Sequence, residues 1–260
     1  MSSTLSVRNL TVRYGGMTAV DDFSFDVPAG SAVGLIGPNG AGKTSVIDAL
    51  SGFARSEGDL FLDEVPFNHL PPHERMRCGL SRTFQSLELF DDLTVRENTL
   101  IGTKRSPLAL RGGARASRRD EVANEVDDAL AFLGLQPFAD SKVRDLSQGH
   151  RKLTCLARAM ASRPGVLLLD EPAAGLDSRE SAWLCDKLTL VRDQGVSILL
   201  VDHDMTLVLN ACSTVYVLNF GVCIAAGPPD TIRADESVIS TYLGSREQKG
   251  EQPDGTVAHH

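Results

Sequence analysis

The chain has 260 residues, of which 42% are hydrophobic and 23% are charged, and its formal net charge is -8. This length and apolar content suffice for one large α/β domain, or for one domain with a subdomain. The acidic balance argues against a nucleic-acid-binding protein, because such proteins need basic surfaces to contact phosphates.

Neither the apolar runs nor the cysteines indicate a membrane-spanning or secreted protein. The most apolar runs, at 166–169 and 198–201, have the length of strands, whereas a membrane helix needs roughly 20 apolar residues. The N-terminus lacks the basic and apolar segments of a secretory signal. The five cysteines are scattered without a C-x-x-C pair, which predicts buried thiols in the cytosol, with no disulfide framework and no zinc site.

Strand patterns dominate the first sixty residues. Residues 5–14 and 19–27 are separated by Gly15 and Gly16, which predicts an antiparallel hairpin. A further alternating strand is expected at 58–63, before a turn-rich segment that contains three prolines.

Residues 37–44 match the phosphate-binding P-loop pattern G-x-x-x-x-G-K-[ST] at every fixed position. A strand expected at 31–36 and a helix expected at 45–50 supply the required context, which makes a chance Gly-rich turn the weaker interpretation. Glycines let successive backbone N–H groups turn inward around an anion at a helix N-terminus. Lys43 would reach the β- and γ-phosphates, and the Thr44 hydroxyl would ligate Mg²⁺. The ATP-binding residues expected here are Gly37, Pro38, Asn39, Gly40, Ala41, Gly42, Lys43, Thr44 and Ser45.

The pattern is helical from about residue 85 to residue 164. Helices are expected at 93–101, 120–133 and 148–162. Thr94 and Glu97 form a capping-box pattern at the start of the first helix. The segment 104–119 carries six basic residues, and it is either a solvated loop or a basic surface that faces anionic lipid headgroups or a partner.

Two later apolar runs, at 165–170 and 196–202, each end in an acidic residue, and a helix is expected between them at 180–194. Short continuous apolar runs are typical of buried parallel strands. The alternation of strand, helix and strand predicts a doubly wound α/β core.

The first of these runs ends in two carboxylates, Asp170 and Glu171, which is the Walker B form. Asp170 is expected to hold Mg²⁺, directly or through water. Glu171 could polarise the attacking water as a general base. Two acids at a helix N-terminus are the alternative, but this does not explain the four apolar residues before them.

Residues 146–151 read Leu-Ser-Gln-Gly-His-Arg and resemble the signature motif of ATP-binding cassette (ABC) ATPases, which usually reads Leu-Ser-Gly-Gly-Gln. His150 thus stands where the family usually has glutamine. The resemblance covers roughly residues 4–243. Other family elements occur in the family's order, namely the adenine-stacking aromatic at Tyr14, the Q-loop glutamine at Gln85, the D-loop at 174–177 and the switch histidine at His203.

The resemblance implies a role for each element. Ser147 and the Gly149 N–H would bind the γ-phosphate of an ATP held by a second cassette. Gln85 would contact Mg²⁺ and the attacking water, and His203 would hydrogen-bond to the γ-phosphate. Asp177 would communicate across the dimer. The catalytic residues would be Glu171, His203 and Lys43, and the metal site would comprise Thr44, Gln85 and Asp170.

The resemblance also implies an architecture. We expect a P-loop NTPase sheet with an antiparallel β subdomain, and a helical subdomain inserted at about 86–164. The cassette would end at residue 243, and the polar tail 244–260 would be disordered.

Residues 81–85, 89–90 and 93–98 resemble cassettes of the branched-chain and hydrophobic amino acid uptake group, as do the insertion 104–119 and the ending 239–244. Urea uptake and lipopolysaccharide export cassettes share much of this pattern. With one P-loop and no membrane helix, the chain is expected to dimerise with a copy or a related cassette. It would dock on transmembrane permease subunits at the cytoplasmic face of a bacterial membrane, and a solute-binding protein would act with it indirectly.

Two other functions are weighed against transport. A soluble cassette of cluster assembly is compatible with this architecture. A regulatory nucleotide binder without turnover is disfavoured, because Lys43, Asp170, Glu171 and His203 are all present.

Overall fold

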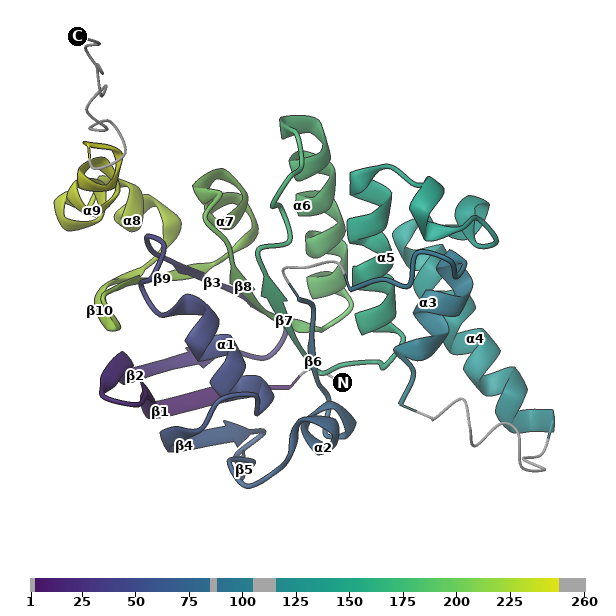
Figure 1. Ribbon diagram of the computed structural model, residues 1–260, viewed down its shortest axis with the longest axis horizontal. Coiled ribbons are helices and arrows are strands. Elements are labelled where there is room, and N and C mark those ends of the chain that lie inside the picture. The colour runs from purple at the N-terminus through teal and green to yellow at the C-terminus, as the bar shows by residue number, and fades with distance from the viewer. Residues whose placement is uncertain (1–2, 85–87, 105–115, 248–260) are drawn as a thin grey trace, which may run out of the picture.

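The computed structural model describes residues 3–84, 88–104 and 116–247. Over these residues the strands form two sheets (Figure 1). The larger sheet has the order β10-β9-β3-β8-β7-β6, and all its neighbours are parallel except β10 and β9. Its strands are β3 (Ala32–Ile36), β6 (Leu80–Arg82), β7 (Val166–Asp170), β8 (Ser197–Val201), β9 (Thr214–Asn219) and β10 (Val222–Gly227).

The smaller sheet is antiparallel and has the order β2-β1-β4-β5. It confirms the expected hairpin, because β1 pairs with β2 along most of its length. Its strands are β1 (Leu5–Tyr14), β2 (Met17–Val27), β4 (Ser56–Leu62) and β5 (Val65–Pro66). The helix α1 (Lys43–Ser51) shares one apolar core with both sheets.

The central strands alternate between two cores. Leu167 and Leu169 of β7 pack into the core that includes α5 (Gln148–Met160), α6 (Ser178–Asp193) and α7 (Met205–Ala211). Val166 and Leu168 of the same strand pack into the core that includes α1 and the antiparallel sheet. Successive strand side chains point to opposite faces, so helices cover both faces, as expected for a doubly wound sheet.

The helical middle of the chain lies beside the larger sheet (Figure 1). Its helices are α3 (Val95–Ile101), α4 (Ala116–Leu133) and α5, with short 3₁₀ turns at Gln136–Phe138 and Val143–Asp145. The capping box predicted at Thr94 and Glu97 is confirmed, since each side chain bonds to the other residue's backbone N–H. This box fixes the start of α3, which packs against α4 and α5.

Several elements had no sequence-based prediction, including α2 (Pro72–Arg77), β9, β10, α7 and α8 (Pro229–Ala234). The last helix, α9 (Glu236–Glu247), runs past the expected boundary at residue 243, so the prediction of a disordered tail is wrong for 244–247. Residues 248–260, and most of the basic segment 104–119, lie outside what the structure describes. No helix among the described residues has the length and apolar character needed to cross a bilayer.

Candidate functional site

The P-loop connects β3 to α1 and requires its glycines. Gly37 and Gly42 have φ angles of 153° and 106°, and a Cβ on either would lie within 2.3 Å of a backbone carbonyl oxygen. Gly42 is also the N-cap of α1 and supplies no side chain to its first turn. The N–H groups at this helix end can therefore face an anion, which is the chemistry that the motif predicts.

Lys43 lies inside the loop. Its Nζ donates to the carbonyl oxygens of Gly37 at 2.7 Å and of Pro38 at 3.0 Å. Burial lowers the pKa of Lys43, while the charges of Glu171, Asp170 and Asp202 oppose this shift. The ammonium is thus fixed at the mouth of the anion-binding loop and lies in the field of the site's carboxylates.

One cleft of about 830 Å³ brings most of the expected site together. It is lined by the P-loop residues Asn39 to Ser45, by Tyr14 and by Glu171 and His203. Sequence reasoning missed two exposed apolar side chains at its rim, Met17 and Phe220. Phe220 has a φ of 46° in the turn between β9 and β10, and the Asn-Phe-Gly sequence of that turn was the available signal. The rim can offer flat apolar surface to a base beside a phosphate site.

Asp170 ends β7 and is 2% exposed. Its Oδ2 accepts a hydrogen bond from Arg82 Nη2 at 3.0 Å, whereas its Oδ1 finds no partner among the described residues. Burial raises the pKa of this carboxyl, and the charge and hydrogen bond of Arg82 oppose the shift. Sequence analysis did not single out Arg82, since nothing local links it to a residue so far along the chain.

These residues fit Mg²⁺. The unpaired Oδ1 of Asp170 is a hard oxygen donor, and the Thr44 hydroxyl at the start of α1 lines the adjoining cleft. In the part of the chain that the structure describes, no cluster of three or more His, Cys, Asp or Glu side chains could hold a metal alone. This agrees with the way Mg²⁺ binds, through one or two protein oxygens together with water and phosphate.

The next residue, Glu171, has its backbone in the left-handed conformation, with a φ of 46°. Its N–H donates to Val201 O at 2.7 Å, and its carbonyl accepts from Lys152 Nζ at 3.2 Å. The carboxylate Oε2 lies 3.6 Å from His203 Nδ1, which also lies 3.5 Å from the buried Asp202. The structure thus places the expected base and the expected switch histidine side by side.

The signature residues lie at the start of α5 and do not line this cleft. Ser147 is exposed, and its Oγ lies 2.8 Å from His150 Nδ1. The Gly149 N–H donates to Glu180 Oε1 at 3.1 Å. Asp177 caps α6, accepting from two backbone N–H groups. The chain therefore does not bring its own Ser147 and Gly149 to its own P-loop, and Gln85 lies outside the described residues.

A sequence model of the ABC transporter family matches residues 20–174. The chain belongs to the ABC transporter family. The expected ABC ATPase, its nucleotide binding and its P-loop NTPase fold are thereby confirmed.

Known proteins of the family resemble this ABC ATPase over nearly their whole length. The branched-chain amino acid transport ATP-binding protein BraF of Pseudomonas aeruginosa is 37% identical, with 92% of this chain and 97% of the relative covered. The lipopolysaccharide export ATP-binding protein LptB of Escherichia coli K12 is 35% identical, with 93% and 98% covered. The crystal structure of the ADP conformation of the cassette MJ1267 superposes with a TM-score of 0.84 at 29% identity, covering 94% of this chain and 100% of that one.

Proposed function

We propose that this ABC ATPase powers the uptake of branched-chain or other hydrophobic amino acids. The ATPase activity is supported by one observation: the P-loop, Glu171 and His203 line the same cleft. The cargo is supported by relatives named for branched-chain amino acid transport, which are 36–37% identical to this chain. LptB, at 35% identity, makes lipopolysaccharide export the second candidate.

We propose a role for each of the site residues. Tyr14 stacks on the adenine, while Lys43 and the P-loop N–H groups hold the phosphates. Thr44 and Asp170, with Gln85, would hold Mg²⁺, which neutralises charge on the β- and γ-phosphates when bound. Glu171 accepts a proton from the attacking water, and His203 hydrogen-bonds to the γ-phosphate beside it.

A second cassette completes each ATP site. Ser147 is exposed and lies outside the cleft of its own chain, so it is free to meet a phosphate held by another molecule. The N-terminus of α5, with Gly149, would supply N–H groups to that phosphate. The second cassette is either a copy of this chain or a related one.

The permease is proposed to dock in a separate groove of about 420 Å³ between α2 and β6 on one side and the helices α3 and α5 on the other. Phe53, Phe90 and Ile101 line this groove and are exposed large apolar side chains. An amphipathic segment of a membrane subunit has the chemistry to cover them. We propose that the chain works at the cytoplasmic face of a bacterial membrane, with a solute-binding protein as an indirect partner.

The test is co-purification from gently solubilised native membranes with wild type and Phe90→Glu. We expect wild type to bring down polytopic permease subunits, and Phe90→Glu to lose them while it keeps ATP binding. Ile239→Glu is the matched control, because Ile239 is exposed on α9, outside the groove. Leucine uptake in vesicles rebuilt from the purified complex then identifies the cargo. Recovery of only soluble partners would contradict the transport role.

A further inference from the structure

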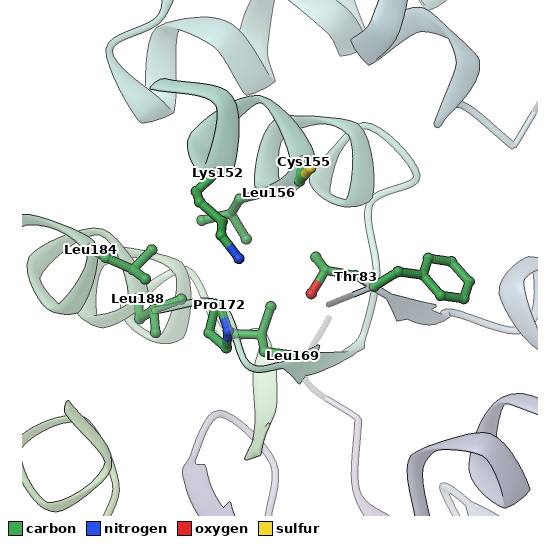
Figure 2. Close-up of a pocket in the computed structure, with 9 residues that line it drawn as sticks. Thr83, Lys152, Cys155, Leu156, Leu169, Pro172, Leu184 and Leu188 are labelled. Carbon is green, nitrogen blue, oxygen red and sulfur yellow. The ribbon is translucent and has the colours of Figure 1, made fainter. Parts of the chain in front are cut away.

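Lys152 is a buried lysine that joins two parts of the cassette. It lies on the second turn of α5, five residues after Ser147, and is 7% exposed. Its Nζ donates to the carbonyl oxygen of Glu171 at 3.2 Å. Figure 2 shows the side chain reaching from α5 toward Pro172 and Leu169 at the end of β7, with the Thr83 hydroxyl facing the same small cavity.

The surroundings of Lys152 are otherwise unfavourable to a charge. Leu156, Leu169, Leu184 and Leu188 line the cavity with it. Burial lowers the pKa of Lys152, and the neighbouring Cys155 together with the charges of Asp202, Glu171 and Asp170 opposes the shift. Burying an ammonium costs free energy that an apolar side chain of the same length would avoid. Packing alone therefore does not explain a lysine here, whereas its bond to Glu171 does.

The bonded carbonyl belongs to a residue whose backbone conformation is unusual. A φ of 46° is uncommon for a residue with a side chain, and such conformations persist only where the surroundings enforce them. Three hydrogen bonds hold the backbone of Glu171. Its N–H donates to Val201 O, and its carbonyl oxygen accepts from the Ala174 N–H at 3.2 Å and from Lys152 Nζ at 3.2 Å. Together they determine the direction in which the Glu171 carboxylate leaves the chain, toward His203.

We propose that Lys152 is a positioning residue for Glu171 and that it ties the signature helix to the catalytic base. This rests on the proposed role of Glu171. Ser147 caps α5 and Gly149 lies in its first turn. The helix that would bind one ATP in the cassette dimer is therefore bonded to the base that would hydrolyse the other. Lys152 thereby links the two ATP sites within one chain.

The experiment compares steady-state ATP hydrolysis and ATP-dependent dimerisation in Lys152→Met, Lys152→Gln and wild type. Methionine keeps the unbranched stem and removes the donor, whereas glutamine keeps a neutral donor. We expect kcat of the methionine variant to fall about tenfold with KM changed less than about twofold, because only orientation of the base is lost. Glutamine should recover part of kcat. The ATP-bound dimer seen by size exclusion should accumulate in Lys152→Met, because ATP still joins the cassettes but is hydrolysed more slowly.

Controls separate this inference from the proposed function. Lys142→Met removes an exposed lysine of the helical subdomain and should behave as wild type. Glu171→Gln tests the base itself: if it hydrolyses ATP normally, the proposed role of Glu171 fails. If Glu171→Gln is inactive but Lys152→Met keeps wild-type kcat, the positioning role alone is overturned. It is also overturned if both Lys152 variants lose ATP binding or the fold, since Lys152 would then be only structural.

Discussion

Arg82 Nη2 lies 3.0 Å from Asp170 Oδ2, and this ion pair is buried. Arg82 Nη1 also pairs with Asp48 of α1 at 2.6 Å, and the guanidinium lies 4.7 Å from the centre of the Phe84 ring. Phe84 lines the groove that we assign to the permease. Arg82 therefore contacts a wall of that groove and the carboxylate proposed to hold Mg²⁺.

Arg82→Met is expected to weaken metal binding. Without the guanidinium, the pKa of Asp170 rises further, because burial remains while the opposing charge is lost. Binding of Mn²⁺ in the presence of ADP, followed by electron paramagnetic resonance, should weaken, because a proton then competes better with the metal for the carboxylate. Asp48→Asn removes the other carboxylate that pairs with Arg82, and this variant should keep nearly the metal affinity of wild type. Equal losses in the two variants would argue against a specific effect on Asp170.

The same substitution should destabilise the protein. Breaking a buried ion pair at one partner typically costs about 3–5 kcal/mol. The double variant Arg82→Met, Asp170→Asn should recover part of this loss, because no buried carboxylate is left unpaired. Urea unfolding of wild type, both single variants and the double variant measures the coupling; additive effects would mean that the pair contributes nothing.

Glu171→Gln is expected to lower kcat by about 100-fold or more, because glutamine cannot accept a proton. ATP binding should persist, so the variant should elute as an ATP-dependent dimer in size-exclusion chromatography. His203→Gln is the comparison variant, because it keeps the Glu171 carboxylate and puts beside it a side chain that can still donate a hydrogen bond. A monomeric Glu171→Gln with normal turnover would refute the assignment of the base.

His150→Gln is expected to retain catalysis with a modest change in turnover. The imidazole lies between the rings of Phe138 and Trp183, and its Nδ1 faces Ser147 Oγ at 2.8 Å. An imidazole nitrogen and a glutamine amide can each hydrogen-bond to a hydroxyl, so the substitution keeps a partner for Ser147. Steady-state ATP hydrolysis of His150→Gln and wild type should therefore differ only modestly. Loss of activity in His150→Gln would contradict this.

The rate at which each cysteine is labelled should fall as its thiol is more deeply buried. Burial raises the pKa of Cys155 to about 11 and that of Cys212 to about 12, so both thiols stay protonated at pH 8. Because the thiolate is the reactive form, iodoacetamide should label exposed Cys78 first and leave these two unmodified in the folded protein. Mass spectrometry of peptides after timed labelling checks the order. Early labelling of Cys212 would mean that α7 opens readily.

The sequence alone determined the parts of this protein that depend on neighbouring residues. The P-loop follows from glycines that must adopt positive φ, and the capping box at Thr94 follows from two side chains three residues apart. The acidic end of β7 follows from a short continuous apolar run of the kind typical of a buried strand. These patterns were predictable because the forces that produce them act within a few residues.

Only the tertiary structure decided which distant residues meet. Arg82 and Asp170 are 88 residues apart and meet because β6 pairs with β7, and Lys152 reaches Glu171 because α5 packs across the end of that strand. Ser147 lies outside the cleft of its own P-loop because the packing of α5 against the sheet fixes where this helix begins. Strand order and helix packing minimise the exposed apolar surface of the whole chain, so no local pattern encodes these contacts.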